Sequence, residues 1–96
     1  MLFIIQYKPK RPNFISSITQ EEVKAVEAHF HYLKELFAEG KAQLIGRRED
    51  GDFGIAILEL PTLIEATSIT DNDPVVKAGV FQATVGEFKL VMGSIS

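Results

Sequence analysis

Residues 42–60 read AQLIGRREDGDFGIAILEL, and the fold is decided in this stretch. Two segments rich in large apolar residues, 42–48 and 53–60, have the composition of β-strands. The four residues between them, Glu49 to Asp52, contain the dipeptide Asp50-Gly51, which favours a tight hairpin turn. The stretch therefore predicts an antiparallel strand pair in the middle of the chain.

A helix is predicted on the N-terminal side of this hairpin. Thr19 is a good N-cap, and Glu22 three residues later completes a capping box. Gly40 ends the pattern, as expected of a glycine just past a helix. Between them an apolar stripe recurs at helical spacing and predicts the buried face: Val23, Val26, Phe30, Leu33 and Phe37.

A second, shorter helix is predicted on the C-terminal side. Thr62 caps it, Glu65 follows at the third position, and the pattern runs to about Asn72. Asp73-Pro74 interrupts it, and residues 75–79 predict a single helical turn that redirects the chain.

Strands are predicted at both ends of the chain, over residues 2–8 and 80–92. The first is followed by a loop over residues 9–17, and Gly86 predicts a bulge or kink in the last. The order β-α-β-β-α-β predicts a ferredoxin-like α+β fold, with one antiparallel sheet and both helices on one face. A chain of 96 residues is enough for one domain, 1–96.

The predicted sheet lacks a clear polar face. In the first strand Phe3 and Ile5 point to one side, while Leu2 and Ile4 point to the other. Because helices cover one face only, the second face needs cover from elsewhere. We expect a homodimer in which two sheets pack face to face, forming a dimeric α/β barrel. The alternative is a monomer whose long loop covers the second face.

Composition limits the possible chemistry and the partners. The chain has no cysteine, which excludes disulfides and thiolate chemistry and fits a cytoplasmic location. Its net charge of −3 argues against a nucleic-acid partner. No apolar run is long enough to span a membrane. Lys8 and Lys10 follow the first apolar run instead of preceding it, unlike a signal peptide.

The two histidines lie on the first predicted helix. His31 projects away from the apolar stripe toward Glu35, so we interpret it as solvated. His29 lies on the flank of the stripe and should be half-buried where the helix meets the sheet edge. Position alone leaves His29 open to two readings, a boundary histidine bonded to a carbonyl or an acid/base group. Because i and i+2 do not share a helix face, the two cannot chelate a metal together, and no metal site is predicted.

Two further charged positions are candidates. Asp73 precedes Pro74, where an aspartate ordinarily caps a new helical turn, although such a carboxylate can also orient an imidazole. Arg47 ends the second strand beside Arg48. It is either a charged strand end that keeps an edge soluble or a clamp for a substrate carboxylate.

Three stretches resemble the YciI-like (YCII-related) family. Residues 27–40 contain His29 followed by Tyr32-Leu33 and a helix-ending glycine. Residues 44–46, Leu-Ile-Gly, resemble a strand that typically ends in Gly-Pro, with Arg47 in place of the proline. Residues 73–79, Asp-Pro-Val-Val-Lys-Ala-Gly, match the family's Asp-Pro-x-x-x-Ala-Gly segment.

This resemblance implies a dimeric α/β-barrel assembly in which His29 and Asp73 form a pair in a cleft. Relatives include dehydrochlorinases of aromatic-ring breakdown, and the fold is similar to that of muconolactone isomerase. With the resemblance, we interpret His29 as a functional residue. Many relatives have no assigned reaction, so the family alone leaves the activity open.

We therefore expect a small enzyme that needs no cofactor. His29 would act as general acid/base with Asp73 fixing its tautomer, in an isomerisation or elimination on a small, aromatic-derived acid or lactone. We expect Tyr7, Gly46 and Arg47 to bind the substrate. One alternative is a non-catalytic dimeric ligand-binding or sensor domain. Another is a cofactorless monooxygenase or a haem-binding relative with His29 as axial ligand.

Overall fold

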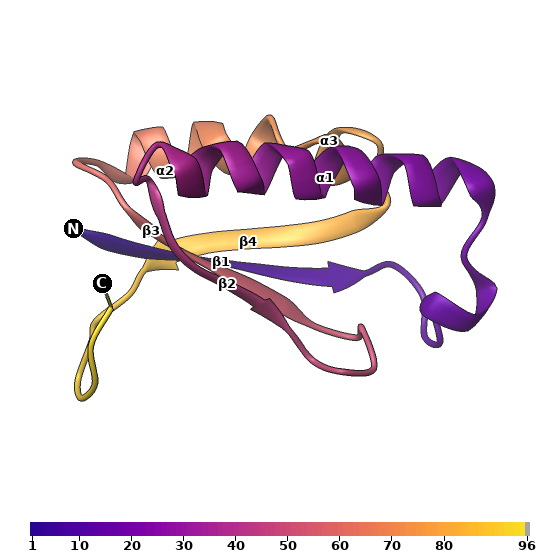
Figure 1. The fold of residues 1–96 in the computed structure, drawn as a ribbon, viewed down its shortest axis with the longest axis horizontal. Coiled ribbons are helices and arrows are strands. Elements are labelled where there is room, and N and C mark those ends of the chain that lie inside the picture. Colours follow the sequence, from indigo (N-terminus) through magenta and orange to yellow (C-terminus); the bar gives the residue numbers. More distant parts are fainter. Residues whose placement is uncertain (96) are drawn as a thin grey trace.

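The computed structural model describes residues 1–95, and the predicted order of elements is confirmed. The elements are β1 (Leu2–Pro9), the 3-10 turn η1 (Ile15–Ser17), α1 (Gln20–Ala38), β2 (Ala42–Arg47), β3 (Gly54–Glu59), α2 (Leu63–Asp71), α3 (Pro74–Lys77) and β4 (Phe81–Glu87). The strands form one sheet in the order β2-β3-β1-β4, and every neighbouring pair is antiparallel. All three α-helices lie on one face of this sheet (Figure 1), so the ferredoxin-like α+β fold is confirmed.

The core lies between the sheet and the helix layer. β1 is central, and its register pairs Phe3 with Leu58 of β3 and Ile5 with Val85 of β4. Phe3, Ile5 and Leu58 are fully buried. Alternate strand residues point to one face, so these side chains meet Leu33 of α1 on the helix side.

Helix α1 begins and ends as its sequence predicts. The Thr19 side chain accepts a hydrogen bond from the Glu22 N–H, and the Glu22 carboxylate accepts one from the Thr19 N–H. At the other end Gly40 has φ +79°, and the Lys41 N–H donates to the Leu36 carbonyl. Both ends of the helix are therefore fixed by local sequence.

The buried face of α1 differs from the predicted stripe. His29, Leu33 and Leu36 are its buried residues, whereas Phe30 and Phe37 are 52% and 58% exposed. Apolar residues cover more than one side of this helix, so periodicity alone could not fix its rotation. The rotation places His29 fully over the sheet instead of half-buried at its edge.

The last strand is shorter than predicted and regular. β4 ends at Glu87, because the Phe88 N–H donates to the Leu2 carbonyl and β1 has no residue beyond this point to pair with. The predicted continuation to Met92 is wrong. Gly86 pairs in register with Ile4, so the predicted bulge there is also wrong. The irregularity lies in β2, between Ala42 and Leu44.

The sheet face away from the helices is divided into two parts. The register places Ile4 opposite Ile57 and Gln6 opposite Thr84 on this outer face. Toward the start of β1 it is apolar, and toward the end it is polar. The apolar part comprises Leu2, Ile4, Leu44, Ile55 and Ile57. Among residues 1–95, no helix is long and apolar enough to cross a membrane.

Candidate active site

Asp73 lies between α2 and α3, where one helix ends and the next begins. It is the N-cap of α3, with Pro74 in the first helical position, and its Oδ1 accepts a hydrogen bond from the Val75 N–H at 3.1 Å. Its side chain is completely buried. The predicted capping role is therefore present, and it fixes the carboxylate at a buried point facing α1.

His29 reaches this carboxylate from α1. Its Nδ1 atom lies 2.9 Å from Oδ1 and 2.8 Å from Oδ2 of Asp73. A carboxylate can only accept, so Nδ1 carries the proton and donates it. The pair that the resemblance implied is therefore formed, and Asp73 fixes both the tautomer and the orientation of the imidazole.

Tyr7 of β1 supplies a third donor to the same carboxylate. Its hydroxyl donates to Oδ2 of Asp73 at 2.8 Å. Burial, and then the negative charge of Asp73, raise the pKa of Tyr7 far above its usual value. The hydroxyl therefore stays protonated and keeps donating. The hydroxyl of Tyr7, a predicted substrate-binding residue, points to Asp73, and its ring borders the cavity described next.

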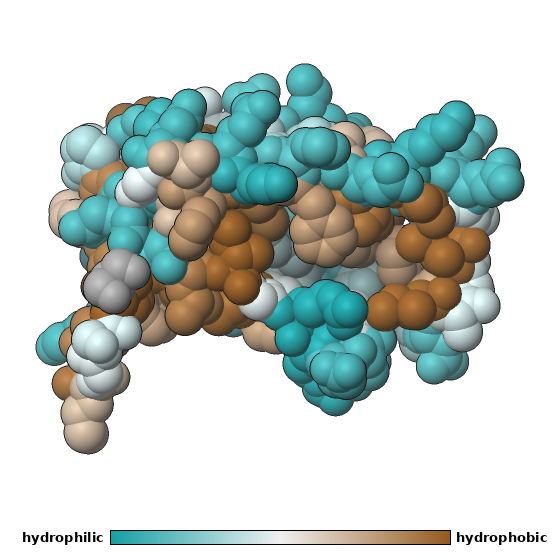
Figure 2. All heavy atoms as spheres, viewed as in Figure 1, coloured by the Kyte–Doolittle hydropathy of each residue, from teal (hydrophilic) through white to brown (hydrophobic). Residues whose placement is uncertain are grey.

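A cavity of about 310 Å³ opens beside the imidazole, between α1, the sheet, the η1 loop and the β2–β3 hairpin. This is at the lower end of the usual range for small-ligand sites, roughly 300–1,000 Å³. Figure 2 shows hydrophobic side chains gathered between the first helix and the sheet, with the hydrophilic hairpin turn projecting below them. The walls are mostly apolar and include Phe14, Ile18, Val26, Phe30, Phe53 and Phe81.

The second ring nitrogen of His29 faces this cavity. Within residues 1–95 the ring makes its hydrogen bonds through Nδ1, and no buried side-chain nitrogen or oxygen is left without a partner. Nε2 is therefore not sealed in the protein, and the ring to which it belongs lines the cavity. An unprotonated Nε2 in this position can accept a proton from a bound molecule.

Aromatic rings hold the imidazole on several sides. The ring of Tyr7 lies edge-on to it with centroids 4.9 Å apart, and Phe81 makes a similar contact at 5.8 Å. Phe30 lies at 5.6 Å on the solvent side. This packing restricts rotation of the imidazole and limits the access of water around it. The sequence did not predict these contacts: Phe30, which follows His29 directly, was assigned to the buried face of the helix, and Phe81 is distant from His29 in the chain.

The two remaining predicted residues lie at the cavity wall on β2. Gly46 and Arg47 both line it. One terminal nitrogen of Arg47 donates to the carbonyls of Arg48 and Glu49, at 2.9 and 3.0 Å, and its side chain is exposed. The structure thus brings Tyr7, His29, Gly46 and Arg47 to one cavity, with Asp73 behind the imidazole.

A contact between two loops lies at the cavity wall, and the sequence contains no signal for it. Gly51, in the hairpin turn with φ +75°, lies against Ile15 of η1 so closely that a Cβ on Gly51 would collide with that side chain. Both residues line the cavity.

In the part of the chain that the structure describes, no group of three His, Asp or Glu side chains could hold a metal ion.

The fold and site together define a small ferredoxin-like domain with a buried imidazole–carboxylate pair beside an apolar cavity. The chain belongs to the family of the YCII-related domain, whose family model matches residues 1–89. The resemblance found in the sequence is thereby confirmed.

Two relatives illustrate the range of this family. The chain is 34% identical over 65 residues to the uncharacterized protein YjpA of Bacillus subtilis (strain 168), covering 68% of this chain and 76% of YjpA. It is also similar in structure to TftG of Burkholderia phenoliruptrix AC1100, a 5-chloro-2-hydroxyhydroquinone dehydrochlorinase solved in complex with 2,5-dihydroxybenzoquinone. The TM-score is 0.68 and the identity 32%, with 93% of this chain and 94% of that one covered.

Proposed function

We propose that this protein is a small acid/base enzyme that uses His29 and Asp73 without a cofactor. One observation carries the proposal: Nδ1 of His29 is bonded to a fully buried carboxylate, which leaves Nε2 of the same ring facing an apolar cavity. A histidine held in this way is oriented to take a proton from a bound molecule and to return it. A purely structural histidine would not need an open nitrogen beside a cavity.

The substrate class that we propose is a small hydroxylated or carbonyl-bearing ring. The cavity volume suits one ring with its substituents, and the walls are largely apolar with aromatic faces. TftG, which shares the fold, acts on a chlorinated hydroxyhydroquinone and was solved with a dihydroxybenzoquinone. Both the walls of this cavity and the ligand of TftG therefore favour planar ring compounds.

The chemistry that the pair supports is proton transfer, with or without elimination. Nε2 takes a proton from a ring hydroxyl or from a carbon next to a carbonyl. The electron pair left behind forms a C=O or C=C bond, and in an elimination the leaving group departs with its own bonding electrons. His29 then releases its proton to water, to the leaving group or to another ring carbon. Asp73 stabilises the imidazolium between these steps.

The proposal is tested by turnover of chlorinated and unchlorinated hydroxyhydroquinones, followed by chloride release and by the absorbance of the ring. His29→Gln should lower kcat/KM by about 10²–10⁴-fold, the usual contribution of a positioned acid/base group. His31→Gln is the matched control, because His31 is exposed on the same helix and should keep the full rate. Turnover by His29→Gln at the wild-type rate would reject the proposal. Binding of these rings without any conversion would favour the non-catalytic module instead.

We also propose that the protein works as a homodimer through the outer face of its sheet. The apolar part of that face includes Leu44, which is 44% exposed, and the segment after β4 adds Leu90, Val91 and Met92, which are 40%, 75% and 88% exposed. Apolar clusters of this kind are uncommon on the free surface of a monomer. A second copy, packed sheet to sheet, would cover residues of the same kind on both chains.

A further inference from the structure

The strand register places Arg47 on the same face of the sheet as the His29 site. Arg47 of β2 pairs with Gly54 of β3, and Gly54 pairs with Tyr7 of β1, so the three residues form one row across the sheet. Tyr7 is on the helix side, where its hydroxyl meets Asp73. Because the residues of one row point to one face, the side chain of Arg47 also leaves the backbone on the helix side.

Gly54 leaves the middle of this row without a side chain. A Cβ at Gly54 would lie 3.6 Å from the Cβ of Arg47 and 4.0 Å from the Cβ of Tyr7. All three residues line the cavity. Two strand spacings, about 10 Å, separate the backbones of Tyr7 and Arg47. The cavity can therefore hold a planar ring above Gly54, with Tyr7 and the imidazole packed against it at one end and Arg47 at the other.

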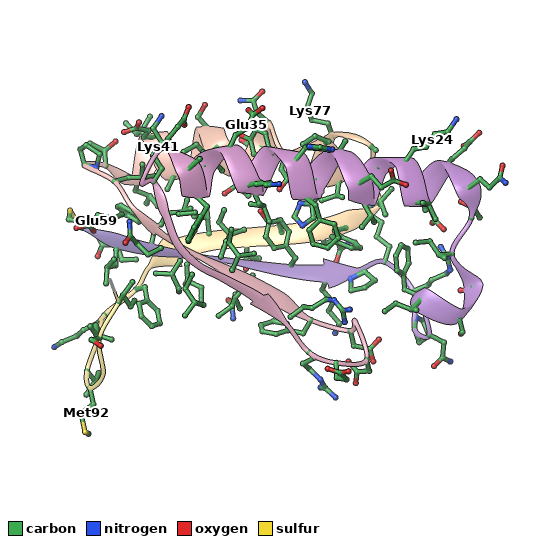
Figure 3. The ribbon with its side chains drawn as sticks, in the orientation of Figure 1. Lys24, Glu35, Lys41, Glu59, Lys77 and Met92 are labelled. Carbon is green, nitrogen blue, oxygen red and sulfur yellow. The ribbon has the colours of Figure 1, made fainter. Side chains whose placement is uncertain are left out.

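Arg47 supplies the charge of this cavity. Of the described residues that line it, Arg47 carries the one permanent charge, and no aspartate or glutamate within residues 1–95 is among them. Lys24 and Glu35 of α1 and Lys77 of α3 project from the helix layer away from the sheet (Figure 3). An anion that enters the apolar cavity therefore meets a single fixed cation, across the row from His29.

The guanidinium of Arg47 is held in place and still has free donors. Its hydrogen bonds to residues 1–95 come from one terminal nitrogen and go to two backbone carbonyls of the hairpin turn. It forms no ion pair with any of these residues. The N–H groups on Nε and on the second terminal nitrogen remain available, and they are arranged to bind an anionic oxygen.

From this geometry we infer that Arg47 binds the ring oxygen on which negative charge develops, while His29 takes the proton at the other end. The inference rests on the proposed function. It narrows the substrate class to rings in which a carbonyl or hydroxyl oxygen is conjugated with the position that loses the proton.

The proton and the electron pair then move in opposite directions. Nε2 of His29 takes a proton from a ring carbon, and the bonding electron pair passes through the conjugated ring to a carbonyl oxygen, which becomes an enolate. The guanidinium of Arg47 stabilises this negative charge in a cavity that otherwise disfavours it. Asp73 stabilises the imidazolium on the far side of the ring.

4-Nitrophenol and its methyl ether, 4-nitroanisole, test the inference, because they share a ring and only the phenol can ionise. The phenolate stands for the enolate of the reaction. NMR titration of the wild type at mildly alkaline pH should place both probes beside His29. Arg47→Gln should weaken 4-nitrophenolate about fivefold, since water screens the ion pair of an exposed side chain. It should leave the affinity for 4-nitroanisole unchanged.

The absorbance of bound 4-nitrophenol separates a role in binding charge from a role in shaping the hairpin. An apolar cavity favours the neutral phenol, whereas a nearby cation favours the phenolate. The pKa of the bound 4-nitrophenol should therefore be higher in Arg47→Gln than in the wild type. Arg47→Lys keeps the charge and should restore most of the difference.

Two further variants serve as controls. Arg48→Gln removes the same charge from the next residue, which is exposed and is not a lining residue of the cavity, so both probes should bind as they do to the wild type. Gly54→Ala adds a methyl group between Tyr7 and Arg47 at ordinary contact distances. It should weaken both probes, because it fills the place of the ring.

The inference is overturned by unchanged affinity for 4-nitrophenolate in Arg47→Gln or Gly54→Ala, by an equal loss in Arg48→Gln, or by failure of both probes to bind beside His29. Turnover of hydroxyhydroquinones that is lost in His29→Gln and kept in Arg47→Gln would also overturn it, while leaving the proposed function intact. Turnover retained in His29→Gln would instead reject the proposed function, whatever the probes show.

Discussion

His29 and Asp73 are 44 residues apart in the chain, yet Nδ1 of the first lies within 2.9 Å of both carboxylate oxygens of the second. The histidine comes from the middle of α1, and the aspartate comes from the cap of α3. Packing of these two helices side by side on one face of the sheet brings the groups together (Figure 1). The site is therefore a product of the βαββαβ topology.

Tyr7→Phe should destabilise the fold and impair turnover together. The change removes a buried donor to the Asp73 carboxylate, and a hydrogen bond to a charged group contributes about 1.5–3 kcal/mol. The free energy of unfolding in urea measures the loss. Tyr32→Phe is the control, since its hydroxyl donates to the neutral carbonyl of Ile69, and it should cost less, about 0.5–1.5 kcal/mol. If the two variants lose equal stability and both keep full turnover, Tyr7 has no special role in holding Asp73.

Gly51→Ala should weaken ring binding as well as stability. Gly51 and Gly40 both have positive φ, so alanine at either position costs roughly 1–2 kcal/mol in backbone strain. At Gly51 the added Cβ would also overlap the Ile15 side chain, which must then move at the cavity wall, whereas nothing lies within 4 Å of a Cβ at Gly40. We expect affinity for 2,5-dihydroxybenzoquinone to fall about fivefold or more in Gly51→Ala, or about 1 kcal/mol. Gly40→Ala should bind as the wild type does, and the same loss in both variants would contradict this role of the contact.

Acid should weaken the junction between the η1 loop and α1. Arg11 first, and then the Thr19 N–H, lower the pKa of Glu22 to about 2 from its usual 4.5. Because the folded pKa is below the unfolded one, the stabilisation is complete above pH 4.5 and is lost as pH falls toward 2. Urea midpoints measured from pH 6 to pH 2 should therefore decline less steeply for Glu22→Gln than for the wild type. Parallel curves would show that this pairing contributes nothing to stability.

The proposed dimer predicts a specific response to charge on the outer sheet face. Leu44→Glu places a carboxylate in the apolar part of that face and should convert the protein to monomers, as measured by light scattering after gel filtration. Ile64→Glu is the control, because Ile64 is 83% exposed on α2 in the helix layer. It should leave the mass unchanged. A wild-type protein that is monomeric at high micromolar concentration would contradict the proposal.

Much of the fold could be predicted from the sequence, because its signals are local. The capping box at Thr19, the glycine at residue 40 and the Asp50-Gly51 turn act through neighbouring residues, and each lies where it was predicted. The end of β4 could not be predicted in this way. It depends on where β1 begins in space, and not on the apolar residues that continue to Met92.

The site shows the same division between local and long-range signals. Asp73 was identifiable as a cap, and the resemblance paired it with His29. The hydrogen bond from Tyr7 could not be foreseen, because it joins residues that are 66 positions apart. The packing of Phe81 against the imidazole likewise depends on tertiary contacts alone.

The tautomer of His29 is the most direct measure of the proposed mechanism, and it can be read without any substrate. A long-range ¹H–¹⁵N correlation spectrum of the imidazole distinguishes the two ring nitrogens. We predict the neutral tautomer with its proton on Nδ1 and none on Nε2, with this preference lost in Asp73→Asn and kept in the exposed control Asp71→Asn. A wild-type spectrum with the proton fixed on Nε2 and a bare Nδ1 would contradict the mechanism.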